Sequence, residues 1–154
     1  MFSLKKLKAV IGNKNASEDS HDSEFTDKII KEVEGAPFAI SQSNVMYAGT
    51  SELAGYHYFK TVIIGTLKLK TLNGATLIVK SDHGQLKLKS DMVELESEIE
   101  KGSNRVITRI DFEIDQEDLG KISRKSIQSL ELISKKNHLH FSVLELTENL
   151  EEEE

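Results

Sequence analysis

A repeat of two residues between positions 105 and 115, with strict alternation of charged and apolar residues from 109 to 115, constrains the fold more than any other feature of the chain. A repeat of two residues is typical of a β-strand with one buried face and one solvated face. The inward set is predicted to be Val106, Thr108, Ile110, Phe112 and Ile114, and the solvated set Arg109, Asp111 and Glu113. The stretch therefore predicts a strand that contributes one whole face to a hydrophobic core.

The same period recurs along most of the chain after Ile40. Further strands are predicted at 57–70, 76–80, 85–89, 127–134 and 138–146. Asn73-Gly74 tolerates the positive φ angles of a tight hairpin turn, and other turns are expected at 82–84, 101–104 and 136–137. A slip in the alternation after Leu88 predicts a β-bulge at Ser90-Asp91. Consecutive hairpins without βαβ alternation predict a mainly β (α+β) chain, built as a single antiparallel β-sandwich or strongly curved sheet of about six to eight strands with one or two short helices.

Two helices are predicted beside the strands. Ile29, Ile30 and Val33 share one face of a helix that Thr26 or Asp27 begins and Gly35 ends. A second short helix, from Asp115 to Ile122, has Asp118 at the position of a capping box.

The ends of the chain differ in composition from its centre. Leu4, Leu7 and Ile11 stand at helical spacing among lysines, which predicts a short amphipathic helix in residues 1–11. Such a helix would contact an anionic membrane surface, or it would dock on its own domain or fray. Docking or fraying is favoured because isolated helices under ~12 residues are marginal. We expect a flexible arm over 1–24 (with a polar linker from 12 to 24), one β-rich domain over 25–147 and a disordered acidic tail over 148–154.

Charge and cysteine content restrict the function classes. The formal net charge is −6, which opposes binding to polyanions, so no nucleic-acid partner is expected. The chain has no cysteine, which excludes disulfides and thiolate chemistry and fits a cytoplasmic location. No apolar run approaches the ~20 residues that cross a bilayer.

No catalytic or cofactor motif is present, and we expect neither cofactor nor metal. His138 and His140 would share one strand face and could reach one ion. A metal site needs a third ligand, which only His21, His57, His83 or an acid could supply, so a solvated face is favoured. Six lysines lie between Leu53 and Ser90, and the stretch that follows, 91–118, is rich in acidic residues instead. Cross-strand ion pairs explain this better than a basic ligand-binding face. The lysines are Lys60, Lys68, Lys70, Lys80, Lys87 and Lys89.

Aromatic residues are concentrated in one segment. The chain has nine Phe and Tyr residues, and five of them lie between residues 38 and 59, together with His57. Tyrosine and histidine combine an apolar body with a polar tip, which suits a contact surface, although the same rings could fill one end of the core. The candidate binding residues are Tyr47, Tyr56, His57 and Tyr58; the last three lie in a loop predicted from Ala48 to Tyr58, and Tyr47 directly precedes it.

These observations leave three functional hypotheses. The first is a non-enzymatic binding module that presents this loop to a protein or a small ligand. The second is a metal-dependent or His/carboxylate enzyme, which requires His57, His83 or the His138/His140 pair to converge with an acid in one pocket. The third is a peripheral membrane adaptor tethered by residues 1–11.

Overall fold

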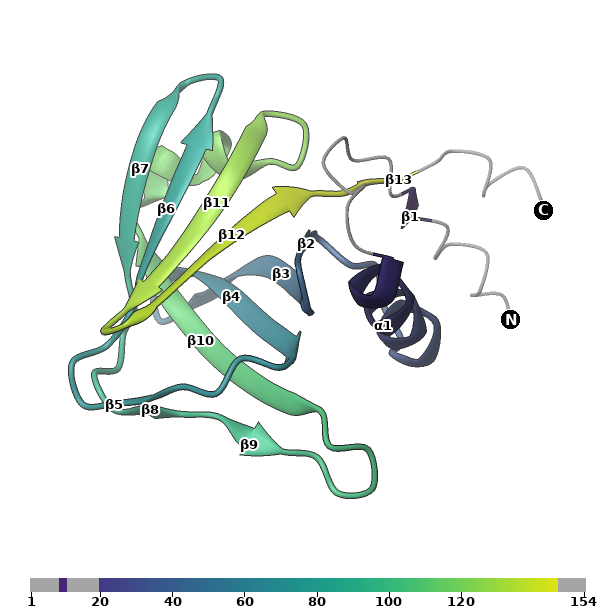
Figure 1. Cartoon of the computed structure of the whole chain (residues 1–154). Helices are drawn as coiled ribbons and strands as arrows, with labels where there is room; N and C mark the ends of the chain where they lie inside the picture. The colour runs from purple at the N-terminus through teal and green to yellow at the C-terminus, as the bar shows by residue number, and fades with distance from the viewer. Residues whose placement is uncertain (1–8, 11–19, 147–154) are drawn as a thin grey trace.

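One strongly curled antiparallel sheet dominates the computed structural model, which describes residues 9–10 and 20–146 (Figure 1). Its nine strands follow the order β7-β6-β11-β12-β2-β3-β4-β10-β9. The mainly β class and the strongly curved form are confirmed, with one strand more than expected. The bounds are β2 Ala39–Ser41, β3 Asn44–Leu53, β4 Tyr56–Gly65, β6 Thr76–Ser81, β7 Gly84–Lys89, β9 Glu98–Ile99, β10 Val106–Ile114, β11 Ile127–Ser134 and β12 Asn137–Val143.

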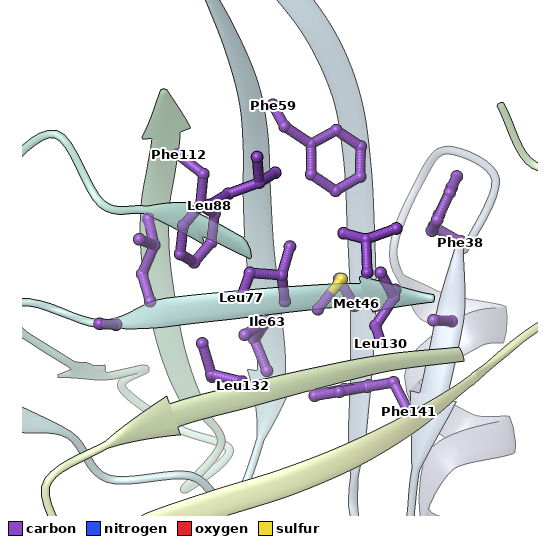
Figure 2. Packing of buried hydrophobic residues seen from close by; sticks show 14 of the residues in the cluster. Phe38, Met46, Phe59, Ile63, Leu77, Leu88, Phe112, Leu130, Leu132 and Phe141 are labelled. Carbon is purple, nitrogen blue, oxygen red and sulfur yellow. The ribbon is translucent and has the colours of Figure 1, made fainter. Parts of the chain in front are cut away.

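The concave side of the sheet encloses the main core (Figure 2). Every second residue of each long strand points into it, as the period of two predicts. On β10 these are the five residues expected from the sequence, and all five are buried. The ring of Phe59 also meets that of Phe38 edge to face, with centroids 5.7 Å apart. The inside-outside assignment of β10 is therefore confirmed.

The two ends of the curled sheet meet at a single point. Ser90, just after β7, forms an isolated antiparallel bridge with Phe112 of β10. The backbone N–H of Asp91 donates to the carbonyl oxygen of Asp111 at 3.0 Å. The predicted bulge at Ser90-Asp91 is wrong, because the chain leaves β7 at Lys89 and crosses to the edge of β10 instead.

The predicted strand over 57–70 ends early, at Gly65. A Cβ on Gly65 would lie 2.0 Å from the carbonyl oxygen of Ser43, so only glycine fits this approach. The Oδ1 atom of Asn44 accepts hydrogen bonds from the N–H groups of Thr66 (2.9 Å) and Leu67 (3.0 Å) and turns the chain out of the sheet.

The expected Asn73-Gly74 hairpin is also wrong. Strand β5 (Lys70–Thr71) pairs with β8 (Leu95–Glu96) in a small separate sheet, not with β6. The N–H of Gly74 donates to the carbonyl oxygen of Val93 at 2.8 Å. The bend at Gly74, with its positive φ of 75°, therefore joins two sheets rather than two paired strands.

Helix α1 (Ser20–Glu32) packs on the other face of β3 and β4 (Figure 1). Ile29 and Ile30 join Val45 and Ile64 in a second buried cluster. The helix begins six residues before the predicted start, and Thr26, expected as a cap, is buried in its middle. Residues 20–24 thus belong to α1 and not to a linker.

A short pairing joins the two ends of the described chain. Strand β1 (Ala9–Val10) pairs with β13 (Glu145–Leu146), so these two residues are not part of the amphipathic helix predicted over 1–11. The rest of that helix, the linker over 12–19 and the acidic tail over 148–154 lie outside the described residues. None of the helices in the described part is both long and apolar enough to cross a membrane.

The predicted second helix is a 3₁₀ helix, η2 (Gln116–Ile122), which contacts β6. It begins after Asp115, but the side chain of that residue makes no capping hydrogen bond. The expected capping box is therefore wrong. Asp118 instead forms an ion pair with Lys121 at 3.1 Å. The last hairpin turns at Lys135-Lys136, one residue earlier than expected.

Candidate functional site

The aromatic segment is a β-hairpin and not the predicted loop. β3 and β4 pair along their whole length up to Leu53 and Tyr56, which face each other. The two residues between them, Ala54 and Gly55, have φ angles of 53° and 87°. Two successive positive φ angles are typical of the tight turn that matches the twist of paired strands. The hairpin therefore holds Tyr56, His57 and Tyr58 at defined positions.

These three residues alternate between the two faces of β4. Tyr56 is 68% exposed at the tip, and Tyr58 is half-buried and lies opposite Glu113 of β10. His57 points to the other side, opposite Ile114, and is also half-buried. At least one ring of the segment is thus accessible to a ligand, which a contact role requires.

Tyr47, the fourth predicted site residue, lies elsewhere. It packs against the cluster under α1, and its hydroxyl group is buried without a hydrogen-bond partner among the described residues. Burial raises the pKa of Tyr47 to about 12, and the positive charge of Arg105 opposes part of that rise. Tyr47 therefore belongs to the packing between helix and sheet.

A groove of about 450 Å³ opens beside the other three residues. It lies where β7 and β10 part from each other beyond the Ser90–Phe112 bridge. Its lining comes from β4, β7, β10 and the start of η2: Tyr56, His57, Tyr58, Leu86, Lys87, Leu88, Lys89, Glu113, Ile114, Asp115 and Asp118.

The alternation of β7 and β10 gives the groove an apolar floor and a charged rim. Leu88 and Ile114 belong to the buried core cluster, and Leu86 is partly buried against it. Lys87 and Lys89 of β7 stand between the leucines and are exposed, as is Glu113 on β10. Five of the eleven lining residues are charged, so the groove is more polar than most small-molecule sites, which are lined mainly by apolar side chains.

No family model, curated protein or solved structure matches this chain. The function is therefore argued from the groove itself.

The lysine ladder expected from the sequence is formed only in part. Lys60 pairs with Asp111 across β4 and β10 at 3.7 Å, and Lys70 pairs with Glu96 across β5 and β8 at 4.0 Å. Within the described residues, neither Lys87 nor Lys89 has an acidic oxygen within 4.0 Å. Four of the six lysines, Lys68, Lys80, Lys87 and Lys89, therefore have no acidic partner among the described residues, and two of them, Lys87 and Lys89, line the groove.

The histidines do not converge. His57 lines the groove, whereas His83 is exposed at the turn between β6 and β7. His138 and His140 flank Glu131 on β11 and β12, at 3.8 and 3.5 Å from its carboxylate oxygens, and both are exposed. Across residues 9–10 and 20–146, no group of three or more His, Asp and Glu is arranged to hold a metal ion.

The sequence predicts the part of the groove that β4 contributes, but not the parts contributed by β7 and by the β10–η2 junction. The sequence predicts Tyr56, His57 and Tyr58 as site residues, whereas it assigns Lys87 and Lys89 of β7 to cross-strand ion pairs and gives the β10–η2 junction no part in binding. One signal was present, since Lys87 and Lys89 share the two-residue spacing of Glu113 and Asp115. That match gains meaning only once β7 and β10 are known to be neighbours.

Proposed function

We propose that this protein is a non-enzymatic binding module that holds a small ligand in the groove between β7 and β10. The observation that carries the proposal is the position of the groove: Tyr56, His57 and Tyr58 line it together with an apolar floor and with four charged residues that form no ion pair within the described part of the chain. The volume of about 450 Å³ lies within the range of small-molecule sites.

The dispersion of the histidines favours binding over catalysis. General acid–base chemistry needs a titratable side chain within hydrogen-bond reach of its partner. His57 shares the groove with acids, but no acidic oxygen of the described residues lies within 4.0 Å of its ring nitrogens. His138 and His140 do lie beside Glu131, but they are exposed and do not line the groove, so the groove itself holds no histidine–acid pair.

A ligand screen by ¹H–¹⁵N correlation spectroscopy tests the proposal. The probes are a panel of water-soluble amino acids, dipeptides, carboxylic acids and amines, added singly to the full-length chain. We expect at least one probe to shift amide signals of β7, of the end of β10 and of residues 56–58, and Tyr58→Ala to weaken that binding. Tyr47→Phe is the matched control, because Tyr47 lies outside the groove. Shifts confined to other surfaces would reject the groove as the site.

A second candidate, contact with a protein partner, is favoured by the tip of the β3–β4 hairpin. Leu53 and Tyr56 face each other there and are 69% and 68% exposed. Tyrosine is among the residue types enriched as anchors in protein interfaces. The test compares wild type with the Leu53→Ser/Tyr56→Ser double variant in affinity capture from the native lysate. A partner captured equally by both proteins would exclude the tip.

A further inference from the structure

We propose that the groove binds a small dipolar molecule, with its cationic group toward Glu113 and Asp115 and its anionic group toward Lys87 and Lys89. An apolar amino acid or a dipeptide with free termini has this chemistry. The inference rests on the proposed function, because it names the chemical class of the ligand that the groove would hold.

The register of β7 and β10 places complementary residues opposite each other. The antiparallel bridge joins Ser90 to Phe112, and the N–H of Asp91 donates to the oxygen of Asp111 in the same register. In an antiparallel ladder, one step back on the first strand is one step forward on the second. Continued toward the groove, this register sets Lys89 against Glu113, Leu88 against Ile114, and Lys87 against Asp115.

The two strands part instead of completing these pairs. β7 forms a ladder with β6 alone, and β10 ends at Ile114 before the chain turns into η2. Within the part of the chain that the structure describes, none of Lys87, Lys89, Glu113 and Asp115 has an oppositely charged group within 4.0 Å. Asp118, which also lines the groove, is already paired with Lys121. Two positive and two negative side chains are therefore left on the walls of one groove.

This distribution of charge selects a ligand that carries both signs. A simple anion would be attracted by the lysine wall but repelled by the acidic wall, and a simple cation would meet the reverse. A dipolar molecule between the walls satisfies both, because its two charges replace the ion pairs that the parted strands do not make. Charge-assisted hydrogen bonds of this kind are stronger than neutral ones.

The floor of the groove suggests an apolar body between the two charges. Leu88 and Ile114 are 5% and 6% exposed and belong to the core, and Leu86 packs beside them. An apolar side chain laid on this floor removes its own surface from water, which favours binding in proportion to the area buried. Tyr58 on the rim offers further apolar contact.

Calorimetric titration of the full-length protein tests the charge requirement. The probes are alanyl-leucine, its N-acetyl form without the cation, its C-terminal amide without the anion, and free leucine. We expect alanyl-leucine or leucine to bind, and removal of either charge to weaken binding about tenfold or more. The comparison of leucine with alanyl-leucine distinguishes a free amino acid from a dipeptide. Equal binding of the charged and blocked forms would overturn the inference.

Variants locate each charge on its wall. Lys87→Gln should weaken binding of the zwitterion about tenfold but cause no further loss for the C-terminal amide, which lacks the anion. Asp115→Asn should likewise weaken binding of the zwitterion about tenfold but cause no further loss for the N-acetyl form, which lacks the cation. Lys68→Gln, an exposed lysine outside the groove, is the matched control. These exposed positions should leave thermal unfolding unchanged, so a loss of binding is not a loss of folding.

The outcomes also separate this inference from the proposed function. Binding of an uncharged or singly charged probe in the groove, with none of the dipolar probes, would reject the dipolar ligand and leave the binding function standing. A groove that binds no probe in either experiment would reject both.

Discussion

Phe59 of β4 and Phe112 of β10 lie directly opposite each other, and both side chains are fully buried. Phe112 also forms the bridge to Ser90 that joins the two ends of the curled sheet. One cross-strand pair of rings thus packs the core at the point where the sheet closes on itself. The stability of the seam and of the core should therefore depend on the same residue.

Phe112→Ala should lower the free energy of unfolding by about 3–5 kcal/mol, because it removes a large buried ring and leaves a cavity in the core. Phe141→Ala, a buried ring on β12, should cost a similar amount. Chemical denaturation of each purified variant measures the change. Lys68→Ala and Lys87→Ala are controls at exposed positions and should change the free energy of unfolding by less than about 0.5 kcal/mol. Costs for the lysine variants equal to those of the ring deletions would reverse the inside-outside assignment.

Asn44→Ala should be costly although it removes no hydrophobic surface. The Asn44 side chain is 3% exposed, and its Oδ1 atom accepts the N–H groups of Thr66 and Leu67 at 2.9 and 3.0 Å. Removing it leaves two polar groups without a partner, so we expect a loss of about 2–4 kcal/mol in the free energy of unfolding. Asn44→Asp keeps the acceptor and should retain more stability than Asn44→Ala. Equal stability of Asn44→Ala and wild type would show that these N–H groups find other partners.

This asparagine illustrates what local sequence patterns predict and what they do not. The period of two located β6, β7, β10 and β11 closely, because each has one buried face whose residues must be apolar. The same pattern continues through Leu67 and Leu69, which are buried, and so it extended β4 past Gly65. The end of that strand depends on Ser43 and Asn44, about 20 residues earlier in the chain, and no local pattern contains that contact.

Tyr47→Phe should leave stability unchanged or raise it by up to about 1 kcal/mol near neutral pH, because it removes a buried hydroxyl that has no hydrogen-bond partner among the described residues. At alkaline pH the difference should grow. The folded-state pKa of Tyr47 is about 12 against an ordinary value of 10.0, so between these values the unfolded chain releases a proton that the folded chain retains. Wild-type stability is therefore fully present below pH 10 and is lost as the pH rises toward 12.

Urea denaturation of wild type and Tyr47→Phe at several pH values from 8 to 12 measures this effect. Subtracting the two curves removes the contribution of the other titrating groups, including Arg124, whose pKa burial lowers. A difference that does not change with pH would mean that Tyr47 is solvated in the folded protein.

The candidate site could be predicted only on one side. Aromatic clustering drew attention to Tyr56 and His57, and the hairpin turn that holds them is local in sequence. The opposite wall combines residues that are distant in sequence, because the chain passes through β8 and β9 between β7 and β10. The total twist of a sheet and its strand order decide which edge strands meet when the sheet curls. Neither property can be predicted from a short segment of sequence.

The seam itself can be tested with introduced cysteines, because the native chain has none. The register of the Ser90–Phe112 bridge places residues 89 and 113 opposite each other. Paired residues of an antiparallel ladder have Cα atoms about 4.5–5.5 Å apart, and positions 89 and 113 stand one step from the bridge, where the strands have only begun to part, so we expect them within the range that a disulfide spans. Lys89→Cys with Glu113→Cys should therefore form a disulfide on mild oxidation, measured by mass spectrometry and loss of free thiol. The crosslink should stabilise the fold by about 2–4 kcal/mol.

Lys87→Cys with Asp115→Cys is the matched pair, two residues farther along the same register, where the strands have parted to form the groove. Disulfide formation requires the two Cα atoms to approach within about 7 Å, so this pair should oxidise much more slowly than the first. Both pairs carry the same charge changes, which makes their difference a measure of distance alone. Equal oxidation rates would mean that β7 and β10 stay paired as far as residues 87 and 115 in solution and that the groove is closed. Failure of the 89/113 pair to crosslink would instead remove the bridge on which the register, and with it the placement of the opposed charges, depends.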